Sequence, residues 1–414
     1  MIRRPPRSTL SSSSAASDVY KRQAEHVPST VRDGALQGRV DWRQEVVITI
    51  DPADARDFDD AIWVRKAGDG WELAVHIADV AHYVRPDTAM DREARERGNS
   101  TYLVDRVLPM LPEQLSNGIC SLVPGEDRLT RCAVMRVDRS GKMVLSRLER
   151  AVIRSHRRLT YEEAQGVLDA GGKEPEAVLS ETEALLRECW KLAGILRKRR
   201  FSEGALDLDF PEIRMELDDL GRAVGYRRND YNESHQLIEE FMLVANEAVA
   251  RAVKNAMRTG MYRVLEDPDH EYIHEFTELA RMHGYEPGDL LNKKHIQRLL
   301  DECRGHPEEH AIKLGLLKSL KRASYREEPI GHYGLSKVDY CHFTSPIRRY
   351  ADLIVHRAID SLLVNPPGEG SGGRASRAQC AEIAGQVSTS ERTSASAEVE
   401  SHRLKMLEWL TLSM

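Results

Sequence analysis

Five aspartates crowd into ten residues of this chain, and apolar segments enclose them on both sides. The stretch "VVITIDPADARDFDDAIWV" occupies residues 46–64, and its carboxylates are those of Asp51, Asp54, Asp57, Asp59 and Asp60. Residues 46–50 and 61–66 are rich in Val, Ile and Trp, which predicts two strands. Two carboxylates about 4 Å apart repel by roughly 4 kcal/mol at an effective dielectric constant near 20. Such a loop must spread its charges into water, take up protons or bind cations.

A solvated acidic loop that binds nothing is the common explanation of a charge run. Three observations favour a metal site here. The flanking strands fix the loop to a sheet, and Phe58 would anchor it in a core. In extended chain Asp57 and Asp59 share a face, with Asp60 pointing away. Oxygen ligands suit Mg²⁺, or Mn²⁺ as a substitute, rather than zinc. Several carboxylates can also hold the ion pair used in two-metal phosphodiester hydrolysis.

The order of predicted elements indicates a mixed α/β (α+β) fold, with strands first and helices after. A third strand is expected at 71–80 after a turn at 67–70, and a hairpin over 135–155 turns at Ser140-Gly141. Thr160 and Glu163 form a capping-box pattern where the chain becomes helical. Apolar spacing predicts an amphipathic helix over 233–258. A further helix is expected over 379–411, after a Gly-rich loop at 365–376.

A second informative stretch, "HFTSPIRRYADLIVHRAIDSLL", covers residues 342–363. Ser345 as N-cap and Pro346 at the first helical position would place Arg348 and Arg349 in the first turn of a helix. Cations are disfavoured there by about 0.3–1 kcal/mol, and a bound anion removes the conflict. The alternative is an Arg348–Asp352 pair without a ligand. Together with the acidic loop, a phosphate site indicates a metal-dependent phosphodiesterase or nuclease.

Composition limits the class and the compartment. The chain has 414 residues, 41% of them hydrophobic and 30% charged, which is typical of a globular enzyme. Its net charge of −6 argues mildly against a nucleic-acid surface binder but allows a local basic channel. The six cysteines form no C-x-x-C pair, which favours a reducing compartment, and we expect the cytoplasm. No apolar run approaches the roughly 18 residues of a membrane span.

At these residues the sequence resembles the ribonuclease II and ribonuclease R family, the RNB exoribonucleases. The matching stretches run in order from about residue 36 to 412, and several long motifs at consistent spacing make the resemblance specific. They are "TIDPADARDFDDAI", "VHIADVAHYV", "MDREARERGNSTYL", "VLPMLPEQLSNGICSL", "SHQLIEEFMLVAN" and "HFTSPIRRYADLIVHRAI".

The resemblance implies an RNB-type catalytic domain with a central sheet, surrounding helices and an internal RNA channel. It implies a processive, hydrolytic, Mg²⁺-dependent 3′→5′ exoribonuclease that degrades single-stranded RNA to nucleoside 5′-monophosphates, and we expect a monomer. Asp51, Asp57, Asp59 and Asp60 match the family's active-site aspartates. Asp59 would be the most critical for chemistry, and we favour Asp51 and Asp60 on one ion.

The resemblance also implies substrate contacts. Arg348 matches the arginine at the scissile phosphate, and we place Arg349 with it as a substrate-binding residue. Tyr102 matches the tyrosine that stacks on the 3′-terminal bases and fixes product length, and stacking holds bases without reading sequence. Glu239, or its neighbour Glu240, lies where the family contacts terminal nucleotides, although on an amphipathic helix it could be a solvated residue or pair with His235. The RNA track is expected along Arg147, Arg150, Arg154, Arg157 and Arg158, and along 197–200, unless these are solvated surface.

The ends of the chain depart from the family pattern. Residues 1–23, Ser-rich and aperiodic, are interpreted as a non-native or disordered leader. Residues 24–44 are expected to be the tail of a preceding oligonucleotide-binding region, and 45–412 the RNB catalytic domain. The chain is therefore interpreted as a fragment. Two other functions stay open: a catalytically impaired RNA-binding fragment of the same fold, and a metal phosphodiesterase acting on a small molecule.

Overall fold

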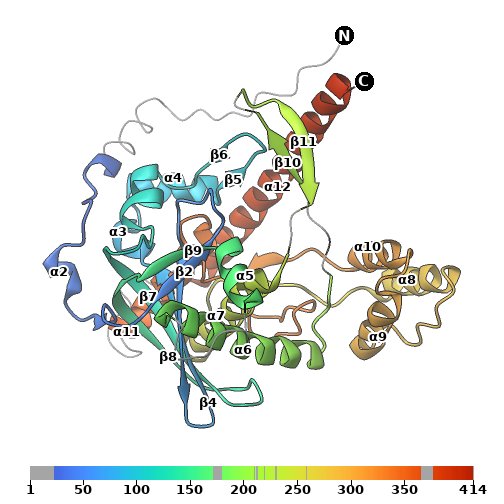
Figure 1. Cartoon of the computed structure of the whole chain (residues 1–414), viewed down its shortest axis with the longest axis horizontal. Coiled ribbons are helices and arrows are strands. Elements are labelled where there is room, and N and C mark those ends of the chain that lie inside the picture. The colour runs from blue at the N-terminus through green and yellow to red at the C-terminus, as the bar shows by residue number, and fades with distance from the viewer. Residues whose placement is uncertain are drawn as a thin grey trace.

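The structure is a computed structural model that describes residues 23–170, 180–208, 210, 213–218, 220–228, 231–257, 259–364 and 376–413. The predicted leader and the predicted Gly-rich loop therefore lie almost wholly outside the described residues. Figure 1 shows a sheet covered by helices, a separate helical lobe and one long C-terminal helix. No described helix is long and apolar enough to cross a membrane.

A seven-stranded sheet forms the centre of the molecule, as the mixed α/β prediction required. β1 pairs with β8 and β2 with β9 in parallel, and the other neighbours are antiparallel. In spatial order the strands are β1 (Val40–Asp41), β8 (Met143–Arg154), β7 (Asp127–Val137), β4 (Gly70–Ala78), β3 (Asp60–Ala67), β2 (Ile48–Asp51) and β9 (Arg157–Thr160).

The predicted hairpins are present. β3 and β4 pair from Asp60 opposite Ile77 to Ala67 opposite Gly70, so the turn occupies residues 68–69. β7 and β8 turn around Gly141, whose φ of 81° favours glycine. The third strand ends at Ala78 and not at residue 80, because the Asp79 side chain accepts the His82 N–H and starts a short helix, α3 (Val80–Tyr83).

Helices pack around this sheet and bury one large apolar core with it. The predicted capping box is confirmed at the start of α5, and the predicted amphipathic helix is confirmed as α7. α6 packs on β3, and α7 packs on β4 and β7. These helices are α4 (Ala89–Arg97), the π-helical turn Gln114–Ile119, α5 (Tyr161–Asp169), α6 (Glu181–Ser202), α7 (Glu233–Met257), α11 (Tyr350–Val364) and α12 (Arg377–Ser413). The short helix α2 (Asp33–Leu36) buries none of its residues.

A helical lobe stands apart from the sheet, at the right of Figure 1. It has its own apolar core, which includes Phe276, Leu299 and Leu316. The sequence indicated no such second core. The lobe consists of α8 (His270–Met282), α9 (Lys293–Cys303) and α10 (Glu309–Ser319). The strands outside the main sheet pair as β5 (Thr101–Tyr102) with β6 (Val107–Leu108), β10 (Ile213–Leu217) with β11 (Ala223–Arg228), and β12 (Tyr262–Val264) with β13 (Ser324–Arg326).

Candidate active site

The aspartate loop, residues 51–60, joins the end of β2 to the start of β3. Ser121 fixes its middle, because the Phe58 N–H donates to Ser121 Oγ (3.0 Å) and this hydroxyl donates to the Arg56 carbonyl (2.7 Å). The Leu122 N–H donates to the Phe58 carbonyl (3.0 Å), and the Phe58 ring is buried. The prediction that Phe58 anchors the loop in a core is confirmed.

The charges of the four carboxylates expected from the sequence affect the pKa values within the group. Asp51 and Asp59 are buried, whereas Asp57 and Asp60 are partly exposed. Burial raises the pKa of Asp51 to about 8, and the charge of Asp60 adds to this rise. Burial also raises the pKa of Asp59 well above its usual range, with smaller contributions from Asp57 and Asp60. The expectation that Asp60 points away rested on extended backbone, and residues 52–59 do not form a strand. The charge of Asp60 acts on both Asp51 and Asp59.

The donor set fits a hard cation. All four pKa values are raised, mainly by burial, so the protein leaves these carboxylates short of positive charge. Asp51 Oδ2 is buried without a hydrogen-bond partner among the described residues. Within that same part of the chain no three Asp, Glu, His or Cys side chains converge closely enough to hold one ion. The loop therefore supplies oxygen donors of the kind that a hard cation prefers.

A turn from a distant part of the chain meets this loop. The Ile347 N–H donates to Asp59 Oδ1 (3.0 Å), and Arg348 Nε lies 3.7 Å from Asp59 Oδ2. The Arg348 side chain keeps 45% of its surface exposed, so its guanidinium can still reach a ligand. The structure thus brings together Asp59 and Arg348, the two residues predicted to carry catalysis.

The prediction that a helix begins at Ser345 is wrong, because α11 begins at Tyr350 and residues 345–349 form a non-helical turn. The Tyr350 N–H donates to the Gly98 carbonyl (2.9 Å), and the Ser100 N–H donates to the Arg348 carbonyl (2.9 Å). These contacts draw the backbone away from helical geometry. The expected anion site at a helix N-terminus therefore does not exist in this form, and Arg348 approaches the aspartates from a turn.

The Arg349 guanidinium is bound to a carboxylate of α11. Its guanidinium forms a bidentate pair with the buried carboxylate of Asp352, both contacts at 2.8 Å. The alternative ion pair considered from the sequence was Arg348–Asp352. In the structure Asp352 pairs with Arg349 instead. A role for Arg349 in binding substrate stays a prediction to which this geometry adds nothing.

Tyr102 lies beside the aspartates. It is on β5, its N–H donates to Glu398 Oε1 of α12 (3.0 Å), and 39% of its surface is exposed. Burial raises its pKa to about 12, and the nearby charges of Arg348, Asp57 and Asp59 also act on it. Its ring is therefore available near the site where a terminal base would stack.

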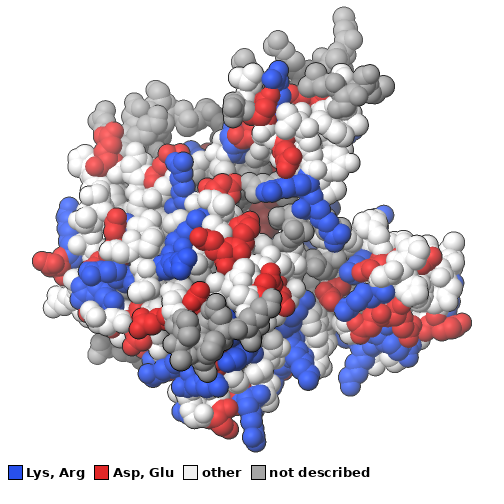
Figure 2. Space-filling view, in the orientation of Figure 1, with Lys and Arg blue, Asp and Glu red and all other residues white. Residues whose placement is uncertain are grey.

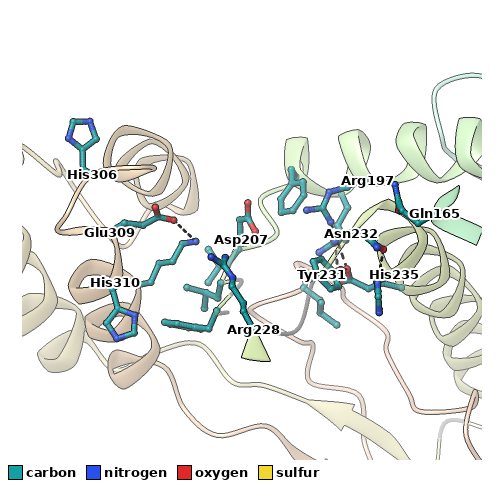
Figure 3. A pocket seen from close by; sticks show the side chains of 18 of the residues that line it. Gln165, Arg197, Asp207, Arg228, Tyr231, Asn232, His235, His306, Glu309 and His310 are labelled. Atoms are coloured by element: carbon teal, nitrogen blue, oxygen red, sulfur yellow. Dashed lines mark hydrogen bonds and ion pairs between the residues drawn. The ribbon is translucent and has the colours of Figure 1, made fainter. Parts of the chain in front are cut away.

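Glu239 lies in a neighbouring cavity of about 1240 Å³ between the sheet domain and the lobe. In Figure 3, Arg197, Tyr231 and His235 form one wall, and His306 and His310 lie opposite. The Tyr231 hydroxyl donates to Glu239, whereas the neighbouring Glu240 is buried against Arg200 at 2.6 Å. Of the two candidates only Glu239 lines the cavity.

The described lining of this cavity does not include the four aspartates. The connection is a stacked pair: the His235 ring lies 3.9 Å from the Tyr161 ring, and burial together with the charges of Asp60 and Asp51 raises the pKa of Tyr161. The cavity-lining His235 thus stacks on a tyrosine that is close enough to the aspartate loop for its charges to act on it.

The predicted basic track is mostly engaged in ion pairs. Arg147 pairs with Glu72 and Glu149, and Arg154 pairs with Asp127. Arg158 is different, because it donates to the Pro52 carbonyl (2.5 Å) and its charge lowers the pKa of Asp51. Figure 2 shows acidic and basic groups interspersed over one face of the molecule. No continuous basic stripe is visible on that face.

Three contacts that build the site were not predicted: those of the Ser121 hydroxyl with the loop, of the Ile347 N–H with Asp59, and of the Asp352 carboxylate with Arg349. The first two contacts are made by a serine hydroxyl and a backbone N–H. Such groups occur throughout any sequence, so no local pattern identifies them. A carboxylate three residues after Arg349 was a detectable signal, but it was interpreted as a partner of Arg348.

Comparison with known proteins identifies the family. The RNB domain model matches residues 39–365. Ribonuclease R of Thermotoga maritima is 43% identical over 347 residues, which cover 83% of this chain and 48% of that protein. Ribonuclease R of Escherichia coli is 38% identical over 353 residues, covering 84% and 43%. The chain spans about half the length of the curated relatives it matches.

Solved structures share the fold. Mycoplasma genitalium RNase R in complex with ribose methylated single-stranded RNA superposes with a TM-score of 0.88 at 28% identity, covering 96% of this chain and 62% of that chain. Its complex with double-stranded RNA gives 0.88 at 29% identity, covering 95% and 70%. Yeast Ssd1, described as a pseudonuclease, gives 0.73 at 20% identity over 90% and 45%, which shows the fold alone. Because the RNB domain model matches residues 39–365, most of its length, the chain belongs to the RNB domain family.

Proposed function

We propose that this chain is a hydrolytic 3′→5′ exoribonuclease that degrades single-stranded RNA processively to nucleoside 5′-monophosphates. One observation carries the proposal: the turn at 345–349 places Arg348 and the Ile347 N–H on Asp59, within a group of four under-neutralised carboxylates. Ribonuclease R relatives, and the RNA complexes of one of them, support RNA as the substrate.

Mg²⁺, with Mn²⁺ as a substitute, is the proposed cofactor. Asp51 and Asp60 would hold one ion, because the charge of Asp60 raises the pKa of Asp51 more than that of Asp57 does, and Asp57 and Asp59 would complete the donor set. When bound, such ions lower the pKa of water and stabilise charge on the leaving oxygen.

The chain's own residues bind and orient the substrate. The Arg348 guanidinium would contact the non-bridging oxygens of the scissile phosphate, and the Ile347 N–H holds the Asp59 carboxylate in place. A water oxygen bonds to phosphorus as the P–O3′ bond breaks, and the departing O3′ takes a proton. Tyr102 would stack on a base near the 3′ end, and Glu239 would contact a terminal nucleotide from the adjoining cavity.

Two alternative functions are an impaired RNA-binding fragment and a small-molecule phosphodiesterase. The fold of Ssd1 shows that this architecture occurs in a protein described as a pseudonuclease, so fold alone does not decide activity. The presence of Asp51, Asp57, Asp59 and Asp60 favours a working site over an impaired RNA-binding fragment. A small-molecule phosphodiesterase is disfavoured, because it needs no exposed stacking tyrosine. A monomeric state and a cytoplasmic location are part of the proposal.

The test uses a 5′-labelled, single-stranded 30-nucleotide RNA with Mg²⁺. We expect a ladder that shortens from the 3′ end, and no shortening with EDTA or with Asp59→Asn, while RNA binding in a gel-shift assay persists. Asp69→Asn is the matched control, since Asp69 is exposed in the turn at the far end of β3. RNA that is bound but never shortened, with any divalent metal, would reject the enzyme and favour the impaired fragment.

A further inference from the structure

Two backbone hydrogen bonds close the 345–349 turn, from the Arg348 N–H (3.3 Å) and the Arg349 N–H (3.0 Å) to the Ser345 carbonyl. The regular helix α11 begins only at Tyr350, yet this single turn carries two contacts to Asp59. The Ile347 N–H and the Arg348 guanidinium both depend on where this turn lies. A flexible turn would leave both groups poorly placed, and misplacement by about 1 Å is enough to slow a reaction severely. Some group must therefore fix the turn.

Asp352, in the first turn of α11, is that group. Its side chain is fully buried. Its Oδ1 accepts the Ser345 N–H (2.8 Å) and an Arg349 Nη2 contact (2.8 Å), and its Oδ2 accepts Arg349 Nε (2.8 Å). One carboxylate thus holds the first and the last residue of the turn.

The same turn also fixes the segment that leads to Tyr102. Arg349 forms a β-bridge with Asn99, and the backbone of 348–350 exchanges hydrogen bonds with Gly98 and Ser100. Tyr102 follows two residues after Ser100. Through this turn the carboxylate of Asp352 therefore supports three parts of the site. They are the contact to Asp59, the Arg348 guanidinium and the strand that bears Tyr102.

We propose that Asp352 is a positioning residue for phosphodiester hydrolysis, acting through Arg349 and Ser345 to hold Ile347 and Arg348 on Asp59. The inference rests on the proposed function and deepens it. Asp352 is not a catalytic residue, because its buried carboxylate is fully occupied by the turn. A simpler role exists, in which the Asp352–Arg349 pair only stabilises the fold, and the two roles predict different kinetics.

The experiment compares Asp352→Asn with Asp360→Asn in the same RNA assay. Asp360 lies two turns later on α11 and pairs with Arg131, so its substitution also breaks an ion pair of this helix but leaves the turn intact. We expect Asp352→Asn to lower kcat about 10- to 100-fold with KM changed less than about threefold, as for other groups that orient a catalytic ligand. Asp360→Asn should leave kcat of the folded protein within about twofold.

A double-mutant cycle separates positioning from stability. If Asp352 acts through Arg348, adding Asp352→Asn to Arg348→Gln should reduce kcat by much less than it does in the wild type. Equal losses in both backgrounds would overturn the inference. Arg349→Lys provides a second variant should Asp352→Asn fail to fold, because it keeps the charge but not the bidentate fork, and we expect a smaller loss of kcat.

A readout independent of activity distinguishes this inference from the proposed function. Hydrogen exchange of a peptide covering 343–349 should be slow in the wild type and in Asp360→Asn, and at least tenfold faster in Asp352→Asn. Unchanged exchange in Asp352→Asn would overturn the positioning role even if RNA is degraded. A wild-type chain that degrades no RNA, yet shows the expected exchange, would instead reject the proposed function.

Discussion

Two buried aspartates at the same end of the neighbouring strands β3 and β4 have opposite electrostatic surroundings. Asp59 precedes β3 and Asp79 follows β4, and the Ala78 N–H donates to the Asp59 carbonyl (2.9 Å). Asp59 is 5% exposed and Asp79 is fully buried. Burial raises the pKa of Asp59 well above its usual range. Burial would do the same to Asp79, but Arg131 and Arg39 hold its pKa well below that range.

The difference lies in where the positive charge comes from. Arg39 contacts Asp79 at 2.5 Å with no exposed side-chain surface, and Arg131 lies at 3.3 Å. The nearest cation to Asp59 is Arg348, at 3.7 Å and almost half exposed. A buried charge without a full internal partner is the pattern expected at functional sites. The Asp79 cluster is therefore neutralised from within the protein, whereas the carboxylates of the aspartate loop have the surroundings that the proposed cation site requires.

The largest effect should come from removing the charge of Asp79. Asp79→Asn leaves Arg39 buried without its carboxylate and leaves Arg131 with Asp360 alone, and we expect the free energy of unfolding to fall by about 3–5 kcal/mol. Asp59→Asn in EDTA should leave it unchanged or raise it, because one of several crowded charges is removed. Urea unfolding measures both.

Asp69→Asn is the control for this pair, and its exposed position predicts a change smaller than about 0.5 kcal/mol. If Asp59→Asn and Asp79→Asn destabilise the protein equally, Asp59 is neutralised internally, and the contrast between the two aspartates does not hold.

Mg²⁺ should act on one of the two regions only. A ligand at 100 times its Kd stabilises the folded state by about 2.7 kcal/mol. We expect a rise in Tm with Mg²⁺ in the wild type and in Asp79→Asn, and its loss in Asp51→Asn, which removes a proposed ligand. A rise that persists at full size in Asp51→Asn would place the ion elsewhere.

The pH dependence of the metal-free protein should sharpen the comparison. Asp51 has a folded pKa of about 8 against an ordinary value of 3.8, so between these values the folded state binds more protons than the unfolded state. The free energy of unfolding then falls as pH rises, by up to about 1 kcal/mol per pH unit between pH 6 and 8. The lowered pKa of Asp79 has the opposite effect, since its stabilisation is lost only below pH 4.

Unfolding in EDTA at pH 6, 7 and 8 measures this slope, and Asp51→Asn should make it flatter. Asp60, whose folded pKa is about 6, keeps a smaller slope below pH 7 in that variant. A wild-type stability that rises with pH over this range would show that the carboxylates are already ionised and compensated.

Local sequence patterns predicted much of the fold. Runs of Val, Ile and Trp around the turn at 67–70 located the β3–β4 hairpin, and the capping box at Thr160 located α5, because both features depend on neighbours in the chain. The start of α11 was predicted wrongly, since local propensity favoured a helix from Ser345. Tertiary hydrogen bonds from Gly98 and Ser100 decided the geometry there, and no pattern near residue 345 contains them.

The candidate site divides in the same way. The aspartate loop was recognisable because its charges are adjacent, and family motifs added Arg348 and Tyr102. The contrast between Asp59 and Asp79 was not recognisable, because Arg39 and Arg131 are 40 and 52 residues from Asp79 in the sequence. Charge compensation is a property of the folded structure, so two similar aspartates could not be distinguished beforehand.

The smallest expected effect tests whether the Asp79 cluster depends on charge or on geometry. Arg39 donates to Asp79 and also to the carbonyls of Ala35, Thr130 and Ala151. Arg39→Lys keeps the charge but loses most of these contacts, and we expect the free energy of unfolding to fall by about 1–2 kcal/mol. Arg65→Lys, at an exposed pair with Glu72, should change it by less than about 0.5 kcal/mol. RNA degradation per folded molecule should be unchanged in both variants, because neither contacts the aspartate loop. A loss with Arg39→Lys as large as that with Asp79→Asn would mean that the fork of hydrogen bonds, and not the charge, keeps Asp79 ionised inside the protein.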